Sequence, residues 1–352
     1  MAYIIMALFI MAGLCSLIEQ HLQSKQRSLL MLLFFVALVL TAGLREVGID
    51  ADSENYEMVY RNYYYSTVSE NTEFTYLLIS AFYNIFTNDV HLLFLTYAIF
   101  GVGLKFIAIR KTTELAFLSI AIYICFYYCV HEVTQIRTGI LSGLFLLSII
   151  PIAEGKRKIA FLLIAIGSCF HVSGLILMPL LFLNNRELCG KRKILWSCII
   201  PVGYVIYFIG HNVTLMSDIP YIGAKLAFYQ QSEETGKYMG VNVFGPLYLL
   251  NVMIFFYLMF FSKTITEHNK YFPILLKIFA LGIASYATFS FVTVIAERIS
   301  LLIRVVGIIL LPCIAYTIAP RWLGIVIVLL LGVIYLNYGL NYIDFHLLWK
   351  VG

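Results

Sequence analysis

Long apolar runs, each followed by a short polar segment, recur along the whole chain. A helix that crosses a bilayer needs roughly 20 predominantly apolar residues. The candidate spans by this criterion are 2–18, 28–44, 90–109, 115–130, 138–153, 159–170, 172–185, 194–210, 241–261, 272–295, 299–319 and 323–343. The runs lack the alternation of apolar and polar residues that marks a membrane β-strand. The pattern predicts an all-α polytopic integral membrane protein with about 12 transmembrane helices, forming one transmembrane domain over 1–352.

Two of these runs, 159–170 and 172–185, are short for a span. Either they extend into their flanks or they form a hairpin that does not fully cross. Residues 74–88 resemble half a span, and a full crossing there would invert every later loop. We expect this segment to be a re-entrant or interfacial helix on the outer side.

Composition supports the membrane class. Of 352 residues, 61% are hydrophobic and 12% are charged, whereas a soluble domain carries about 25% charged residues. The basic residues are dispersed among short loops and form no stripe, so no nucleic-acid partner is expected. The seven cysteines are scattered, without a CxxC pair, and are predicted to pack as small core residues. The N-terminal run lacks the basic region of a signal peptide and is interpreted as the first span.

The polar segments fall into a basic set and a less basic set. EQHLQSKQR, RKTTE, EGKRK, NNRELCGKRK, SKTITEHNK and APRW together hold 14 of the 24 Lys and Arg residues. Short basic loops stay in the cytoplasm, so the other set lies outside: HEVTQIR, CFHVSG, AERISLLIR and the two longer loops 45–73 and 210–240. Both termini are then expected outside, and no separate soluble domain is predicted.

Placing a charged residue at the end of a membrane helix costs free energy, so each such residue is expected to have a partner or a function. Those predicted on the outer side come from distant segments, and one helical bundle can bring them around a single cavity. They are Arg45, Asp50, Asp52, His131, Glu132, Arg137, His171, Glu297, Arg298 and Arg304.

Several of these residues have two interpretations. Arg45 either snorkels to the headgroups or is paired with Asp50 and Asp52. The two aspartates have other interpretations: they form a solvated acidic loop, supply a base, or hold a divalent cation. Arg137 begins a span whose small face, Gly139 and Gly143, favours close helix packing.

His171 lies where two short apolar runs meet, and broken helices at membrane depth usually line a cavity. A satisfied core histidine is the alternative. Arg298 and Arg304 are six residues apart, so they need not share a helix face. The dispersed histidines suggest no metal site.

Arginines facing a membrane cavity suit a phosphorylated lipid, because guanidinium groups bind phosphate oxygens in pairs and keep their charge. Aromatic residues suit sugars, which stack on tyrosine faces. The tract NYEMVYRNYYYSTVSENTEFTY, which contains Tyr56, has that character, although an interfacial aromatic belt explains it equally well.

Four segments resemble an EpsG-type member of the O-antigen and exopolysaccharide polymerases, the Wzy class. They are LREVGIDADSENY, TQIRTGILSGLFLL, FHVSGLILMPL and ERISLLIRVVGIILLP. Ile49, Ala51 and Thr138 depart from the residues that are frequent in the family, but the charged positions are retained.

The resemblance implies a multi-pass protein of the bacterial inner membrane with an active site on the periplasmic side. The implied reaction transfers a growing glycan from undecaprenyl pyrophosphate to the next lipid-linked repeat unit, without a cofactor or metal. Arg45, Arg137, Arg298 and Arg304, with Tyr56 and His131, would bind the pyrophosphate and glycan. Asp50, Asp52 and His171 are the candidate bases. A chain-length regulator is a possible partner.

Other functions fit the same membrane class. They are an O-antigen ligase, a flippase for lipid-linked oligosaccharides, and a membrane O-acyltransferase. Ligases of this kind carry a longer outer loop, and a flippase would distribute its charges through the depth of the cavity. We expect Arg45→Ala and Arg137→Ala to leave folding intact and to abolish polymer.

Overall fold

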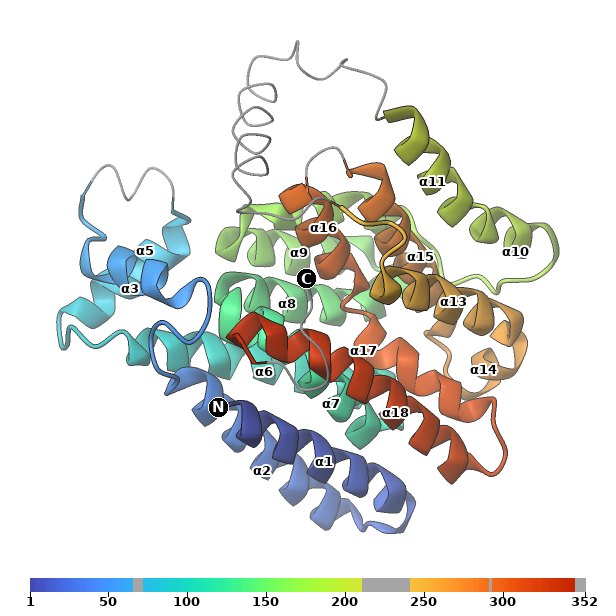
Figure 1. Cartoon of the computed structure of the whole chain (residues 1–352), viewed down its shortest axis with the longest axis horizontal. Helices are drawn as coiled ribbons and strands as arrows, with labels where there is room; N and C mark the ends of the chain where they lie inside the picture. Colours follow the sequence, from blue (N-terminus) through green and yellow to red (C-terminus); the bar gives the residue numbers. More distant parts are fainter. Residues whose placement is uncertain (66–71, 211–240, 291–292, 346–352) are drawn as a thin grey trace. The chain divides into compact units, whose positions relative to one another are not determined.

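The computed structural model describes residues 1–65, 72–210, 241–290 and 293–345, and all regular structure in these ranges is helical (Figure 1). Seven helices there are long and apolar enough to cross a membrane, and up to nine if each of two bent helix pairs counts as one span. These findings are consistent with a polytopic membrane protein, but the predicted count of about 12 spans is not confirmed. Nearly all of the predicted outer loop 210–240 lies outside the described residues.

The described residues form two compact units, one within 1–185 and 308–345 and the other within 186–307. The prediction of a single transmembrane domain stays a prediction. The helices of the first unit are α1 Ala2–Ile18, η1 Glu19–His21, α2 Ser24–Gly43, α3 Ser53–Arg61, α5 Phe74–Asn84, α6 His91–Thr112, α7 Ala116–Ile122, η2 Tyr123–Thr134, α8 Ile136–Ala153, α9 Arg157–Phe170, η3 Val172–Phe182, η4 Leu311–Tyr316, α18 Arg321–Leu340 and η5 Asn341–Ile343.

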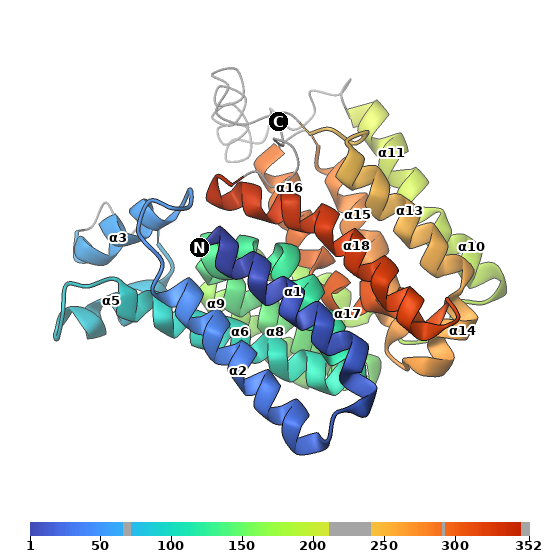
Figure 2. The same ribbon diagram turned by 60° about the horizontal axis from the view of Figure 1, so that its bottom comes forward.

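The first unit is organised around α7, η2 and α8. Helix α6 packs on α2 and α8, α8 packs on α9, and α18 contacts both α1 and η2 (Figure 2). Gly143 permits the close approach of α6, since a Cβ there would lie 2.7 Å from the Cβ of Leu104. The small face of α8 therefore serves helix packing, as one of the two interpretations predicted.

The span that begins at Ala116 is longer than the sequence predicted. Its second half, η2, is a π-helix, and every residue from Ala116 to Thr134 is buried. The predicted outer loop HEVTQIR is therefore wrong in its first half, because His131 and Glu132 belong to the helix. Lys105 of α6 pairs with Glu132, so the charge that the longer helix carries is compensated.

The two short runs form two short helices that pack against each other. Helix α9 has 14 residues and the 3₁₀-helix η3 has 11. At about 1.5 and 2.0 Å per residue, each is roughly 21 to 22 Å long, less than the roughly 30 Å of the hydrocarbon core. The hairpin alternative fits this geometry, and His171 lies at its bend with an extended backbone.

Helix α5 has 11 residues, or about 16 Å, and is too short to cross a bilayer. It packs on α3, α6 and α9. Its exposed apolar residues Phe74, Leu78 and Phe82 recur every four positions and so lie on one face. This pattern fits the expected interfacial helix.

Two basic loops of the first unit meet, as their predicted assignment to one membrane side requires. Arg27 Nη2 donates to the carbonyl of Glu114 at 2.9 Å and lies 2.7 Å from Glu19 Oε1. Glu19 also accepts the amides of Ala116 and Phe117. Two loops assigned to the same membrane side on charge alone therefore lie at the same end of this unit.

The second unit is built around α15. Its helices are α10 Gly190–Ser197, α11 Ile199–Gly210, α13 Pro246–Phe260, α14 Ser262–His268, α15 Phe272–Thr288 and α16 Thr293–Arg304, and α17 Gly307–Leu310 follows it. Helices α11, α13 and α16 all pack on α15. The bent pair within this unit is α13 with α14, at 77°.

Candidate functional site

Arg45 and Asp50 form a buried ion pair at the end of α2. Arg45 Nε donates to Asp50 Oδ2 at 3.0 Å, and Arg45 Nη1 donates to the carbonyl of Ala42 at 2.7 Å. Both side chains are fully buried. Snorkelling to the headgroups therefore does not describe Arg45, and the interpretation in which an acidic residue complements it agrees with the geometry.

Asp50 also organises the loop that follows it. Its Oδ1 accepts the backbone amides of Asp52 and Ser53, both at 3.0 Å, and Ser53 begins α3. The hydroxyl of Ser53 accepts the amide of Gly48, whose φ of 91° suits glycine. Because both oxygens of Asp50 are engaged, the geometry gives it a role in holding the loop. Its predicted role as a base, like that of the partly buried Asp52, stays a prediction.

A second charged cluster joins three segments that are distant in sequence. Glu73 precedes α5, Arg137 lies in the first turn of α8, and His171 follows α9. Glu73 Oε2 accepts a hydrogen bond from Arg137 Nη1, and Glu73 Oε1 lies 3.0 Å from His171 Nδ1. The three side chains are between 16% and 23% exposed, so the cluster is shielded but reachable. We call these residues the Glu73 cluster.

The environment stabilises the charged form of Glu73. Burial raises the pKa of its carboxyl group, but the close contact with His171 and the charges of Arg137 and His171 outweigh burial and lower the pKa to about 2. The carboxylate is therefore ionised at neutral pH. A carboxylate beside Nδ1 of an imidazole holds the ring in one orientation.

Tyrosines surround the Glu73 cluster. The rings of Tyr56 and Tyr76 are stacked with centroids 5.8 Å apart, and the Arg137 Cζ lies 5.6 Å from one and 5.9 Å from the other. Burial raises the pKa of Tyr56 to about 12, so its hydroxyl stays protonated. Tyr76 donates from its hydroxyl to the carbonyl of Tyr56, and the ring of Tyr97 lies 6.0 Å from that of Tyr76.

The two arginines are connected through aromatic rings. Arg45 Cζ lies 4.0 Å from the ring centroid of Phe94, and the rings of Phe94 and Tyr56 meet edge to face at 6.5 Å. Tyr56 in turn contacts Arg137. Arg45 Nη2 and Arg137 Nε are buried and have no hydrogen-bond partner among the described residues. The structure therefore brings Arg45, Arg137, Tyr56 and His171 into one region, which is only part of the set that the sequence predicted around a single cavity.

His131 lies elsewhere in the first unit, in a fully buried setting. Its ring packs 5.8 Å from that of Tyr127, and neither ring nitrogen has a hydrogen-bond partner among the described residues. Next to it, Lys105 Nζ lies 2.5 Å from Glu132 Oε1 and donates to the carbonyl of Gly139 at 2.8 Å. The predicted role of His131 in substrate binding stays a prediction, but its ring is enclosed by protein.

Arg298 and Arg304 belong to the second unit, and α16 presents them differently. Arg298 is exposed, whereas Arg304 is buried and donates from Nε to Ser300 Oγ at 2.9 Å. Ser300 donates in turn to the carbonyl of Gly282 on α15. The six-residue spacing thus places the two guanidinium groups in different environments, and their predicted roles stay predictions.

Sequence reasoning missed Glu73 and the Lys105–Glu132 pair as site-forming groups. Glu73 stands in a polar tract with other acids, and only the fold of α5 against α9 selects it. Lys105 is a lysine within an apolar span, and such a position predicts an acidic partner. Within the described ranges, no three His, Cys, Asp or Glu residues are grouped so as to hold a metal ion.

Comparisons with known proteins agree with this sequence pattern. The chain is 22% identical over 309 residues to the amylovoran biosynthesis protein AmsC of Erwinia amylovora, an alignment that covers 81% of this chain and 79% of that protein. No solved structure matches the chain significantly. The model of the EpsG family matches residues 28–350, which include both charged clusters, and the chain therefore belongs to the EpsG family.

Proposed function

We propose that this protein is a membrane glycosyltransferase that polymerises an exopolysaccharide. It would transfer a growing glycan from undecaprenyl pyrophosphate to a lipid-linked repeat unit on the periplasmic side of the inner membrane. Family membership and the biosynthetic role in the name of the AmsC relative support this class. The observation that carries the proposal is the Glu73 cluster. It places a candidate base, His171, and a cation, Arg137, on either side of the Glu73 carboxylate and among tyrosines.

In the proposed reaction, a hydroxyl oxygen of the acceptor sugar attacks the anomeric carbon of the donor glycan. The bond between that carbon and the pyrophosphate oxygen breaks, and undecaprenyl pyrophosphate leaves with the bonding electrons. His171 Nε2 takes the hydroxyl proton, a role that contributes typically 10²- to 10⁴-fold in rate. Glu73 holds Nδ1 and stabilises the imidazolium that forms.

Arg137 is the residue proposed to contact the leaving pyrophosphate. Its side chain is 23% exposed, so a ligand can reach part of it. Protonation of His171 gives the cluster a net charge of +1 as negative charge develops on the leaving group, which favours the transition state electrostatically. Arg45 is fully buried, so we assign it to positioning Phe94 and Tyr56 and to the local positive potential.

A gel of lipid-linked and surface glycans from a deletion strain tests the proposed class. A polymerase predicts that cells lacking this protein display single repeat units and no ladder, and that the wild-type gene restores the ladder. Full-length chains retained on the lipid carrier would indicate a ligase. Repeat units trapped in the cytoplasmic leaflet would indicate a flippase.

A further inference from the structure

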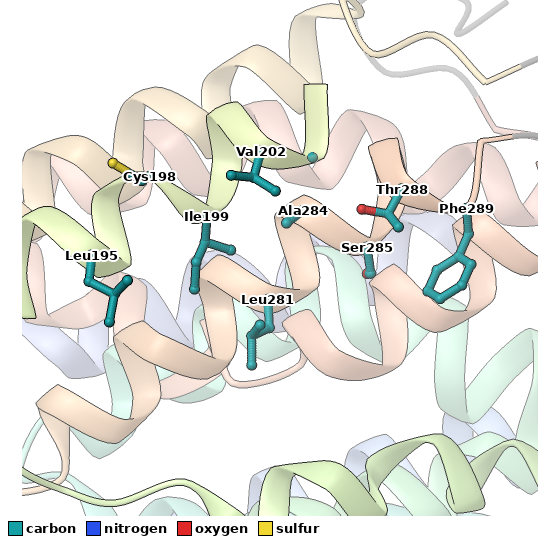
Figure 3. A pocket seen from close by; sticks show the side chains of 10 residues that line it. Leu195, Cys198, Ile199, Val202, Leu281, Ala284, Ser285, Thr288 and Phe289 are labelled. Carbon is teal, nitrogen blue, oxygen red and sulfur yellow. The ribbon is translucent and has the colours of Figure 1, made fainter. Parts of the chain in front are cut away.

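An apolar groove of about 380 Å³ lies within the second unit, between α10–α11 and α15 (Figure 3). Leu195, Ile199 and Val202 line one wall, and Leu281 and Ala284 line the other. Leu195 and Val202 are more than half exposed. Such a surface is unfavourable in water but well matched to a hydrocarbon chain.

Cations gather at the Leu195 end of this groove. Trp196 follows Leu195, and Lys277 Nζ lies 5.8 Å from the Trp196 ring centroid. Lys277 Nζ also donates to the carbonyl of Arg186 at 2.7 Å, and the charges of Arg192 and Arg186 both act on Lys277. Arg186 and Arg192 are exposed. Segment 186–197 and Lys277 together carry five cations and one acid.

The cationic end of the groove is built from two loops that the sequence assigns to the cytoplasmic side. Lys193 Nζ donates to the carbonyl of Phe260 at 3.2 Å, and Ser262 Oγ donates to the carbonyl of Leu188 at 3.5 Å. The second bond joins NNRELCGKRK to SKTITEHNK, and the first joins NNRELCGKRK to the end of α13. On the predicted assignment of these loops, the groove begins at the headgroup level of one leaflet and continues along the apolar faces of α11 and α15.

We propose that this groove binds an anionic glycerophospholipid of the cytoplasmic leaflet. One acyl chain would lie between Val202 and Ala284, and the headgroup phosphate would contact the exposed Lys191 and Arg192. The buried Lys277 would add positive charge nearby. Apolar lining alone would accept any bilayer lipid. Charge complementarity selects an anionic one, because basic pockets between membrane helices on this side favour anionic headgroups. The assignment is independent of the glycan chemistry proposed for the first unit.

Native mass spectrometry of the full chain in mild detergent tests the site. The probes are phosphatidylglycerol and phosphatidylcholine with identical acyl chains. We expect selective retention of phosphatidylglycerol. Lys191→Gln combined with Arg192→Gln should weaken that binding about thirty-fold, since each basic residue near an anionic headgroup contributes a roughly five-fold effect. Removal of two exposed cations elsewhere, Lys25→Gln with Lys158→Gln, should leave it unchanged.

A second pair of variants tests the groove itself. Val202→Trp fills it and should lower phosphatidylglycerol binding at least ten-fold, whereas Val205→Trp, at an exposed position of α11 outside the lining, should not. Equal binding of the two lipids, or equal behaviour of the two tryptophan variants, would overturn the proposal. A third result would also overturn it. If undecaprenyl phosphate displaces phosphatidylglycerol at a far lower concentration than another glycerophospholipid does, the groove belongs to the polyprenyl carrier.

Discussion

Glu73→Gln is the most informative perturbation of the candidate site, because Glu73 contacts both Arg137 and His171. The variant keeps the shape of the side chain but removes its charge. The carboxyl pKa is about 2 in the folded protein against an ordinary 4.5, and each pKa unit corresponds to about 1.4 kcal/mol. The charge therefore contributes on the order of 3 kcal/mol, and partial screening by water lowers this to about 2 kcal/mol.

The sign of the pH dependence follows from the lowered pKa. A depressed carboxyl pKa stabilises the folded state fully above pH 4.5, and this contribution disappears as the pH falls from 4.5 towards 2. Thermal unfolding of the purified protein in detergent should show the wild type above Glu73→Gln at pH 7. The difference should shrink below pH 4.5.

The activity effect should exceed the stability effect. Without the carboxylate, His171 loses its orientation, and we expect polymer formation to fall at least roughly 100-fold. Glu73→Gln combined with His171→Ala should be no slower than His171→Ala alone, because the two residues act as a unit. Initial rates of ladder formation in reconstituted membranes measure both quantities.

Glu57→Gln is the matched control for this experiment. Glu57 lies on α3 and pairs with Arg61 at 2.6 Å on the exposed surface, where such pairs contribute at most about 1 kcal/mol. We expect wild-type ladders from this variant. If Glu73→Gln and Glu57→Gln behave alike, the assignment of the Glu73 cluster is refuted.

Three further predictions concern buried groups. Arg45→Ala leaves the buried carboxyl group of Asp50 without its partner, so we expect the free energy of unfolding to fall by about 3 to 5 kcal/mol. This replaces the expectation of intact folding. The temperature at which the variant aggregates on heating measures the effect, and a wild-type melting temperature would contradict it. Lys105→Met should destabilise similarly, and adding Glu132→Gln should restore part of the loss, whereas additive losses in the double variant would show that the pair is uncoupled. Gly339→Ala should lower the melting temperature because its Cβ would collide with the backbone of η2, and an unchanged value would mean that α18 can shift.

The sequence by itself determined the class of the protein and the shared end of two of its basic loops. Apolar runs and sparse charge require a bilayer, because a soluble fold cannot hide so much apolar surface. Charge asymmetry assigned EQHLQSKQR and RKTTE to the same side, and Arg27 and Glu114 meet there. The proximity of Asp50 to Arg45 was also predictable, because a costly charge at a helix end calls for a local counter-charge.

Only the tertiary structure decided which distant groups meet and where helices end. Glu73 stands among several acids in a polar tract, and its contact with Arg137 and His171 depends on how α5, α8 and α9 pack. The continuation of η2 through His131 and Glu132 was also unpredictable from local hydropathy. A buried charge is stable within a span when a partner such as Lys105 neutralises it, and that partner lies 27 residues away in the sequence.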